Sequence, residues 1–188
     1  MKKVVFFLTA LVITTAASAQ TWSLDKAHSK VGFSVTHLMV STVDGAFKTV
    51  DAKITSSKED FSDATFEFSA ETASVDTDND QRDEHLKKAD FFDVEKFPTI
   101  TFKSTSVKKT GKTYAVKGNL TFHGVTKPVD LTLTLNGTAV HPYTKKTIAG
   151  FKATGTIKRA DFNFGSGTPS AVVSDEVTIT ANGEFAKD

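Results

Sequence analysis

Several residues have the types that metal binding requires, but their spacing is wrong for it. Asp76, Asp78 and Asp80 alternate like the first ligands of a calcium-binding EF-hand loop. Such a loop also needs Gly at its sixth position and Glu at its twelfth. The chain has Gln81 and Lys87 at those positions. We therefore interpret the three aspartates as solvated charges that can cap a helix.

Histidines are the next candidates, and none lies in a linear zinc motif such as H-E-x-x-H. The chain contains His28, His37, His85, His123 and His141. We predict no metal and no cofactor, and we expect His28, His37 and His123 to form hydrogen bonds at strand ends. The alternative is that these three converge on one end of the fold, as in an enzyme.

Ser166 lies between two glycines, as a hydrolase nucleophile could. In the nucleophile elbow G-x-S-x-G, however, the glycines lie two residues away from the serine. Those two positions hold Phe164 and Thr168. No linear motif supports catalysis, so we predict a binding protein and not an enzyme.

The N-terminus has the three-part pattern of a secretory signal peptide. Lys2 and Lys3 precede an apolar run over residues 4–13, and small residues follow at Ala17 and Ala19. The run is about half of the roughly 20 residues that a transmembrane helix needs. We predict a signal peptide over residues 1–19, cleaved after Ala19, and a periplasmic mature chain with no transmembrane segment.

Composition restricts the partners of the mature chain. The sequence has no cysteine, which excludes a disulfide framework and a thiolate metal site. Loss of Lys2 and Lys3 leaves 21 of the 23 basic residues against 22 acidic ones. This near-neutral balance gives no electrostatic reason to bind nucleic acid or an anionic membrane, and we expect neither as a partner.

Apolar and polar residues alternate along most of the chain after Gln20, which is typical of antiparallel strands with one buried face. Seven alternating segments and a strand near residues 45–54 give eight strands, with a short additional strand around residues 22–24. Closure into a barrel hides the edges of so many strands. We therefore predict one all-β domain over residues 20–188, an eight-stranded antiparallel β-barrel.

Turn-forming residues separate the predicted strands. Residues 109–112 and 123–128 are predicted as tight reversals, residues 136–137 as a bulge or a turn, and His141 as the start of a longer loop. One charged segment lacks alternation and predicts the only helix, of about three turns, over Asp80–Ala89. One of residues 78–80 would cap it, and Phe91, Phe92 and Phe97 would hold it to the barrel.

The apolar strand faces should point into the barrel, because the polar faces must meet water. The predicted cavity lining is Phe33, Val35, Phe66, Phe68, Phe102, Leu120, Phe122, Leu131, Leu133, Phe151, Gly155, Ile157 and Ile179. Glycines 118, 155 and 183 on these faces either mark bends and bulges or leave room for a ligand, and we predict that Gly155 faces an open hollow. An eight-stranded barrel is either filled by side chains or holds one small ligand.

Several motifs occur in order along the chain. W-x-L-D-x-x-H-S-x-V-x-F-x-V-x-H-L begins at Trp22, G-x-F at Gly45 and D-x-R-D-x-H-L at Asp80. D-F-F-D and F-P-x-I-x-F follow, then G-x-L-T-x-x-G-V-T, R-x-D-F and V-x-I. Together they resemble the YceI-like family of exported polyisoprenoid-binding proteins over essentially the whole mature chain. Asn163 stands where that family commonly has glycine.

The resemblance implies a lipocalin-like barrel whose elongated apolar cavity takes a polyisoprenoid, a quinone tail or another long lipid chain. It also implies a periplasmic protein, often a homodimer, that is linked with stress responses and lipid handling. We expect Arg82, His85 and Arg159 to meet the lipid head group at the mouth; alternatively, both arginines pair with Asp83 or Asp161 on the surface. Two other functions stay open, namely a lipid-modifying enzyme of the same fold and an interaction module with a filled barrel.

Overall fold

The computed structural model describes residues 18–188. The signal peptide predicted over residues 1–19 therefore lies outside the described residues, apart from its last two positions. Within residues 18–188, no helix has the length and apolar character needed to cross a membrane.

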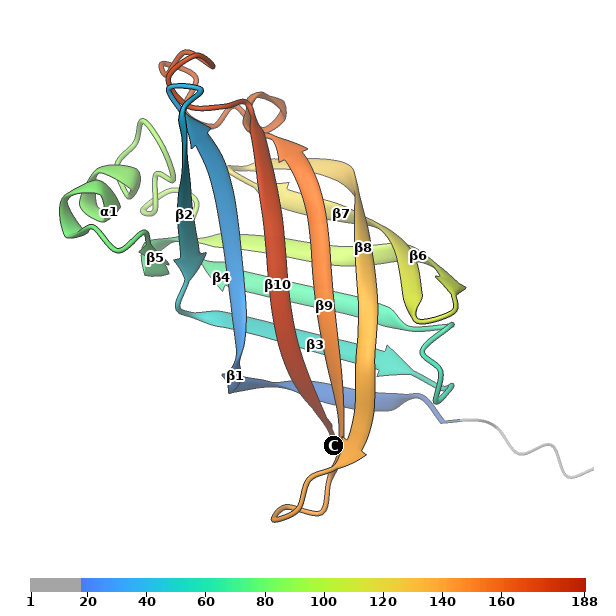
Figure 1. The fold of residues 1–188 in the computed structure, drawn as a ribbon. Coiled ribbons are helices and arrows are strands. Elements are labelled where there is room, and N and C mark those ends of the chain that lie inside the picture. The colour runs from blue at the N-terminus through green and yellow to red at the C-terminus, as the bar shows by residue number, and fades with distance from the viewer. Residues whose placement is uncertain (1–17) are drawn as a thin grey trace, which may run out of the picture.

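Ten strands make up one continuous antiparallel sheet (Figure 1). The strands are β1 (Gln20–His37), β2 (Ser41–Phe47), β3 (Val50–Ser56), β4 (Thr65–Glu71), β5 (Val75–Asp76), β6 (Thr99–Thr110), β7 (Thr113–Phe122), β8 (Val125–Val140), β9 (Thr147–Lys158) and β10 (Glu176–Lys187). One α-helix, α1 (Asp80–Leu86), and two 3₁₀ turns, η1 (Thr72–Ser74) and η2 (Arg159–Phe162), complete the described elements.

Eight of these strands close into a ring, which confirms the predicted fold class. The order is β1, β3, β4, β6, β7, β8, β9 and β10, and β10 pairs again with β1, with Phe33 opposite Ile179. The first half of β1 pairs with β3, whereas its second half pairs with β2, which in turn carries the short β5. The ring is therefore extended on one side by β2 and β5, close to α1.

Two strand predictions were wrong in detail. The segments around residues 22–24 and 31–37 form the single long β1, which bends at an irregularity between Asp25 and Lys30. The single strand predicted near residues 45–54 is interrupted at Lys48 and Thr49, which separate β2 from β3. Both differences arise near β2, which lies outside the closed ring and pairs with the second half of β1.

The turn predictions are confirmed. Gly111 has φ +62° in the β6–β7 turn, and His123 and Gly124 both have positive φ in the β7–β8 turn, as two-residue hairpin loops require. Leu135 and Gly137 flank a bulge in β8. Asn163 has φ +54° at the end of η2, a left-handed conformation that asparagine tolerates better than most residues.

The helix is shorter than predicted, because α1 ends at Leu86 and not at Ala89. The Asn79 side chain caps its N-terminus by accepting a hydrogen bond from the Arg82 amide. After Lys87 the chain makes further turns, and it brings Phe92 against Phe47, with ring centroids 5.6 Å apart. The phenylalanines that follow the helix therefore do hold this segment to the barrel.

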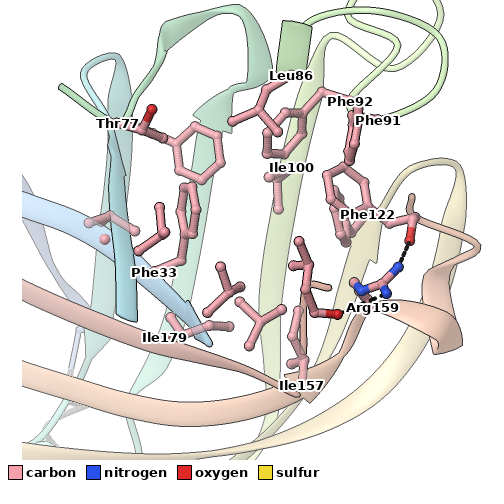
Figure 2. A pocket seen from close by; sticks show the side chains of 18 of the residues that line it. Phe33, Thr77, Leu86, Phe91, Phe92, Ile100, Phe122, Ile157, Arg159 and Ile179 are labelled. Atoms are coloured by element: carbon pink, nitrogen blue, oxygen red, sulfur yellow. Dashed lines mark hydrogen bonds between the residues drawn. The ribbon is translucent and has the colours of Figure 1, made fainter. Parts of the chain in front are cut away.

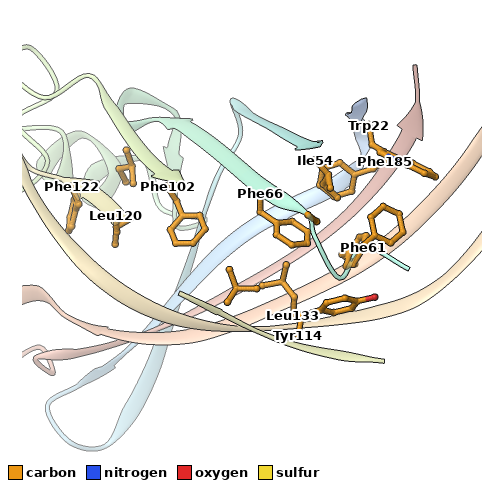
Figure 3. Packing of buried hydrophobic residues seen from close by; sticks show 14 of the residues in the cluster. Trp22, Ile54, Phe61, Phe66, Phe102, Tyr114, Leu120, Phe122, Leu133 and Phe185 are labelled. Atoms are coloured by element: carbon orange, nitrogen blue, oxygen red, sulfur yellow. The ribbon is translucent and has the colours of Figure 1, made fainter. Parts of the chain in front are cut away.

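One end of the barrel is packed solid. Phe61 and Tyr114 are fully buried there, and the Phe61 ring lies 5.1 Å from Trp22 and 5.2 Å from Phe151 (Figure 3). The buried Tyr114 hydroxyl donates a 2.8 Å hydrogen bond to the Asp60 carbonyl oxygen. Loop 57–64 thus closes this end with the Phe61 ring, which packs against aromatic side chains of the strands.

Candidate functional site

The other end of the barrel is hollow. A cavity of about 540 Å³ lies inside it, within the roughly 300–1,000 Å³ that small-molecule sites occupy. Its walls are almost wholly apolar (Figure 2). Nine of the predicted lining residues are in the wall, namely Phe33, Val35, Phe68, Phe102, Leu120, Phe122, Leu131, Ile157 and Ile179.

A second, smaller cavity of about 130 Å³ lies next to the first. Phe66, Leu133 and Phe151, also predicted as lining residues, belong to its wall. Five residues line both cavities, namely Val31, Phe68, Phe102, Leu131 and Ile179. The two spaces therefore follow one another along the barrel and give an elongated apolar interior, so the filled barrel does not describe this chain.

Gly155 is the exception among the predicted lining residues. It is opposite Leu131 of β8 and Ile179 of β10, on the inward face. A Cβ atom added at Gly155 would overlap a Leu131 methyl group and lie 3.2 Å from the Asp130 carbonyl oxygen. The prediction that Gly155 faces an open hollow was therefore wrong, because the side chain of the neighbouring strand fills the space.

The same arrangement occurs at the other two inward glycines. The Phe102 ring lies over Gly118, and the Phe185 ring and a Leu24 methyl group lie over Gly183. These glycines accommodate large side chains from their neighbours. Both nevertheless lie at register shifts, as the bulge interpretation predicted. Gly118 is opposite Ser104, where β6 shifts register between Ser104 and Ser106, and Gly183 is opposite the irregularity of β1 between Asp25 and Lys30.

Exposed residues of the cavity wall mark its mouth, between α1 and loop 163–175. Three residues line the cavity and are also exposed to solvent, namely Arg82, His85 and Val172. Arg82 donates from Nε to the Thr77 hydroxyl and from Nη2 to the Thr77 carbonyl oxygen, both at 2.7 Å. Its Nη1 forms no hydrogen bond to residues 18–188, so it is free to donate to a ligand. His85 lies edge-on to Phe91, with centroids 5.0 Å apart.

Arg159 has a different role from the one predicted. It is buried, and its five N–H groups all point at backbone carbonyl oxygens. The acceptors are those of Phe164, Gly165, Thr168, Val173 and Ser174, at 2.6–3.3 Å. No donor is left for a lipid head group. Arg159 instead holds loop 163–175 in place at the mouth.

The alternative expectation, that both arginines pair with nearby aspartates, was also wrong. Asp83 accepts hydrogen bonds from the amide and hydroxyl of Thr77. Asp161 pairs with Lys127 at 3.3 Å. Within the described part of the chain, neither arginine forms an ion pair.

Part of the cavity wall could not be found by alternation. Val43, Thr77, Leu86, Phe91, Phe92, Phe164 and Val173 are in the wall but were not predicted. Most come from α1 and from the loops around it, which have no period-two pattern. The only signal was the run of phenylalanines after the predicted helix.

The three histidines considered for catalysis have separate surroundings. His37 forms a backbone bridge to Val173 at the mouth, and the His123 ring lies tilted against that of Phe97, with centroids 4.5 Å apart. His28 lies at the irregularity of β1, where its Nδ1 is 2.9 Å from Asp25 Oδ2. This hydrogen bond raises the pKa of His28 and lowers that of Asp25. The arrangement does not supply a shared catalytic centre.

Comparisons with known proteins agree with this architecture. The family model of the YceI-like domain matches residues 22–185. The protein YceI of Salmonella newport is 41% identical over 181 residues, which cover 95% of this chain and 94% of that protein.

Solved structures give the same result. The crystal structure of the Campylobacter jejuni YCEI protein has a TM-score of 0.74 and 34% identity, covering 88% of this chain and 96% of that one. A polyisoprenoid binding domain from Saccharophagus degradans has a TM-score of 0.66 at 17% identity, covering 89% and 98%; this likeness concerns the fold alone. The length of the family match and the identity to the Salmonella protein show that the chain belongs to the YceI-like family.

Proposed function

We propose that this protein binds a long apolar lipid, a polyisoprenoid or an isoprenoid-quinone-like molecule, with the tail inside the barrel. The observation that carries the proposal is the elongated apolar interior, which is open at one end and packed at the other. Burial of each CH₂ group yields about 0.8 kcal/mol. A hydrocarbon tail therefore needs no specific polar partner inside. The polyisoprenoid binding domain of Saccharophagus degradans, which has the same fold, supports this ligand class.

The head group would stay at the mouth, near Arg82 and His85. Arg82 keeps N–H groups free there, and its position is fixed by Thr77. Phe91 supports His85 from the side. This placement supports carriage, storage or sequestration of the lipid, because the wall around the tail is almost wholly apolar.

We also propose that the protein acts in the periplasm. The support comes from the signal-peptide pattern of residues 1–19, since those residues precede the described barrel. Detection of the mature N-terminus at Gln20 in a periplasmic extract would test this part.

Two neighbouring residues of β8 allow a matched test of binding. Leu131 lines both cavities, whereas Thr132 is exposed on the opposite face of the same strand. Leu131→Trp should block the interior, and Thr132→Trp should leave it open. We expect native mass spectrometry and organic extraction to find a prenyl lipid in the parent protein and in Thr132→Trp, and to find much less in Leu131→Trp. Equal lipid content in all three, or none in the parent after exposure to prenyl lipids, would contradict the proposal.

A further inference from the structure

An exposed apolar tip adjoins the mouth of the cavity. Leu38, Met39 and Val40 form the turn between β1 and β2, and their relative exposures are 52%, 78% and 86%. The Leu38 amide donates a 2.9 Å hydrogen bond to the carbonyl oxygen of Val172, which itself lines the cavity. Figure 1 shows this turn beside the loop that precedes β10, at the same end of the barrel.

Both segments that meet at this rim lack charge. Residues 31–43 and residues 162–174 contain no Asp, Glu, Lys or Arg. Because 24% of all residues are charged, a stretch of this length would ordinarily carry about three charged residues. The two segments are fixed to each other by hydrogen bonds between Thr36 and Ser174. We call this surface, residues 36–40 and 168–174, the uncharged rim.

Another side of the mouth is charged. Helix α1 contains Asp80, Arg82, Asp83 and Glu84, and two lysines follow it. The uncharged rim, with the exposed apolar side chains of Leu38, Met39, Val40 and Val172, lies beside a charged side of the mouth. This arrangement matches the boundary of a lipid bilayer, where apolar side chains enter and charged groups stay among the head groups.

We propose that the uncharged rim inserts into a bilayer surface, so that the cavity opens onto the membrane that holds its ligand. This inference rests on the proposed lipid-binding function and adds the route by which the tail enters. A second copy of the chain fits the tip less well. A stable dimer buries about 800 Å² on each partner with some 20–30 residues, whereas the tip is three residues wide beside Val172.

The opposite end of the barrel offers a matched control. Tyr143, at 88% exposure, and Val140, at 64%, lie at the loop between β8 and β9, far from the mouth (Figure 1). They are as exposed as the tip but belong to the wall of neither cavity described above. Met39→Trp and Tyr143→Trp therefore place equivalent reporters at the two ends. The natural Trp22 is buried and common to both variants.

The test uses phosphatidylcholine vesicles, with and without added phosphatidylglycerol. We expect a blue shift of fluorescence for Met39→Trp and none for Tyr143→Trp. Because the rim has no Asp, Glu, Lys or Arg, binding should persist when about 0.5 M salt screens electrostatic attraction. Met39→Asp should weaken vesicle binding at least tenfold, whereas Tyr143→Asp should not, and both variants should keep the parent melting temperature because these side chains are exposed.

Other outcomes would overturn the proposal. Equal shifts at both ends, or binding that requires phosphatidylglycerol and vanishes with salt, would refute insertion of the rim. A dimer that Met39→Asp dissociates would show that a second copy covers the tip. Lipid found by extraction in a protein that does not bind vesicles would refute this inference alone, whereas absence of lipid uptake would refute the proposed function.

Discussion

The side chain of Leu131 fills the space above the Cα atom of Gly155 on the neighbouring strand. Any side chain at position 155 must therefore displace Leu131, which can move only toward the cavities that it lines. We predict that Gly155→Leu lowers the free energy of unfolding by about 1–3 kcal/mol, and that the displaced Leu131 reduces lipid binding. Urea denaturation and lipid titration of the same sample measure both effects.

A size exchange serves as the control for that experiment. Adding Leu131→Gly to Gly155→Leu restores the total volume at this pair of positions. We expect the double variant to recover most of the lost stability. If its loss equals the sum of the two single losses, Leu131 does not cause the strain.

Arg159 gives the second prediction. Arg159→Met removes the donors of five backbone carbonyl oxygens in and beside loop 163–175. Buried acceptors without partners cost about 1–3 kcal/mol each, so we expect a loss of at least 2 kcal/mol and faster hydrogen exchange of this loop. Lys127→Gln, which breaks the surface pair with Asp161, should cost less than about 1 kcal/mol. Similar effects of the two substitutions would contradict the role assigned to Arg159.

The third prediction contrasts the packed end of the barrel with the hollow end. Phe61 is fully buried among Trp22 and Phe151, so Phe61→Ala should cost about 3–5 kcal/mol and leave the cavity wall unchanged. Ile157 is half-buried beside existing empty space, so Ile157→Ala should cost less than about 2 kcal/mol. Chemical denaturation would reveal the difference, and equal costs would mean that the two ends are packed alike.

Acid stability gives the fourth prediction. Hydrogen bonds from the hydroxyl groups of Ser56 and Ser57, and then from backbone amides, hold the pKa of Asp63 well below its usual range. The hydrogen bond from Lys109 is the main reason that the pKa of Asp60 falls to about 2. A carboxyl group with a depressed folded-state pKa stabilises the protein above its unfolded pKa, near 3.9, and loses that contribution as the pH falls toward the folded value.

Stability should therefore decline below about pH 4, through loop 57–64. Asp63→Asn should be less stable at neutral pH and should show a flatter decline in acid. Asp51→Asn, in an exposed pair with Lys26, should follow the parent curve closely. Thermal melts from pH 6 to pH 2 compare the three proteins. Parallel curves for Asp63→Asn and the parent would exclude this loop as the acid-sensitive element.

Alternation predicted most of the barrel because it is a local property of each strand. Phe33 and Ile179 alternate with polar residues that must face water, so their side chains were predicted to point inward. Both line the cavity. The sequence did not predict the interruption between β2 and β3, because it depends on which strands pair with each of them. The relationship of Leu131 to Gly155 depends on cross-strand register, which no single strand encodes.

The mouth was harder to predict than the wall. Arg159 could be selected as a candidate, but its burial follows from the course of loop 163–175, which has no periodic pattern. Phe92 and Phe164 form part of the wall from segments without strands. Sequence patterns therefore identified the lining residues that lie on strands, whereas the lining residues on loops are placed by tertiary contacts.

The packed end of the barrel has a consequence for the order of events in lipid handling. Phe61, Tyr114 and Trp22 are buried across that end, so a chain that binds through the mouth would enter tail first and leave head first. Every molecule carried in this way would have the same orientation. The lipid head group would remain accessible at the mouth while the tail stays buried. A receiving enzyme or membrane could therefore bind the head group before the barrel releases the tail.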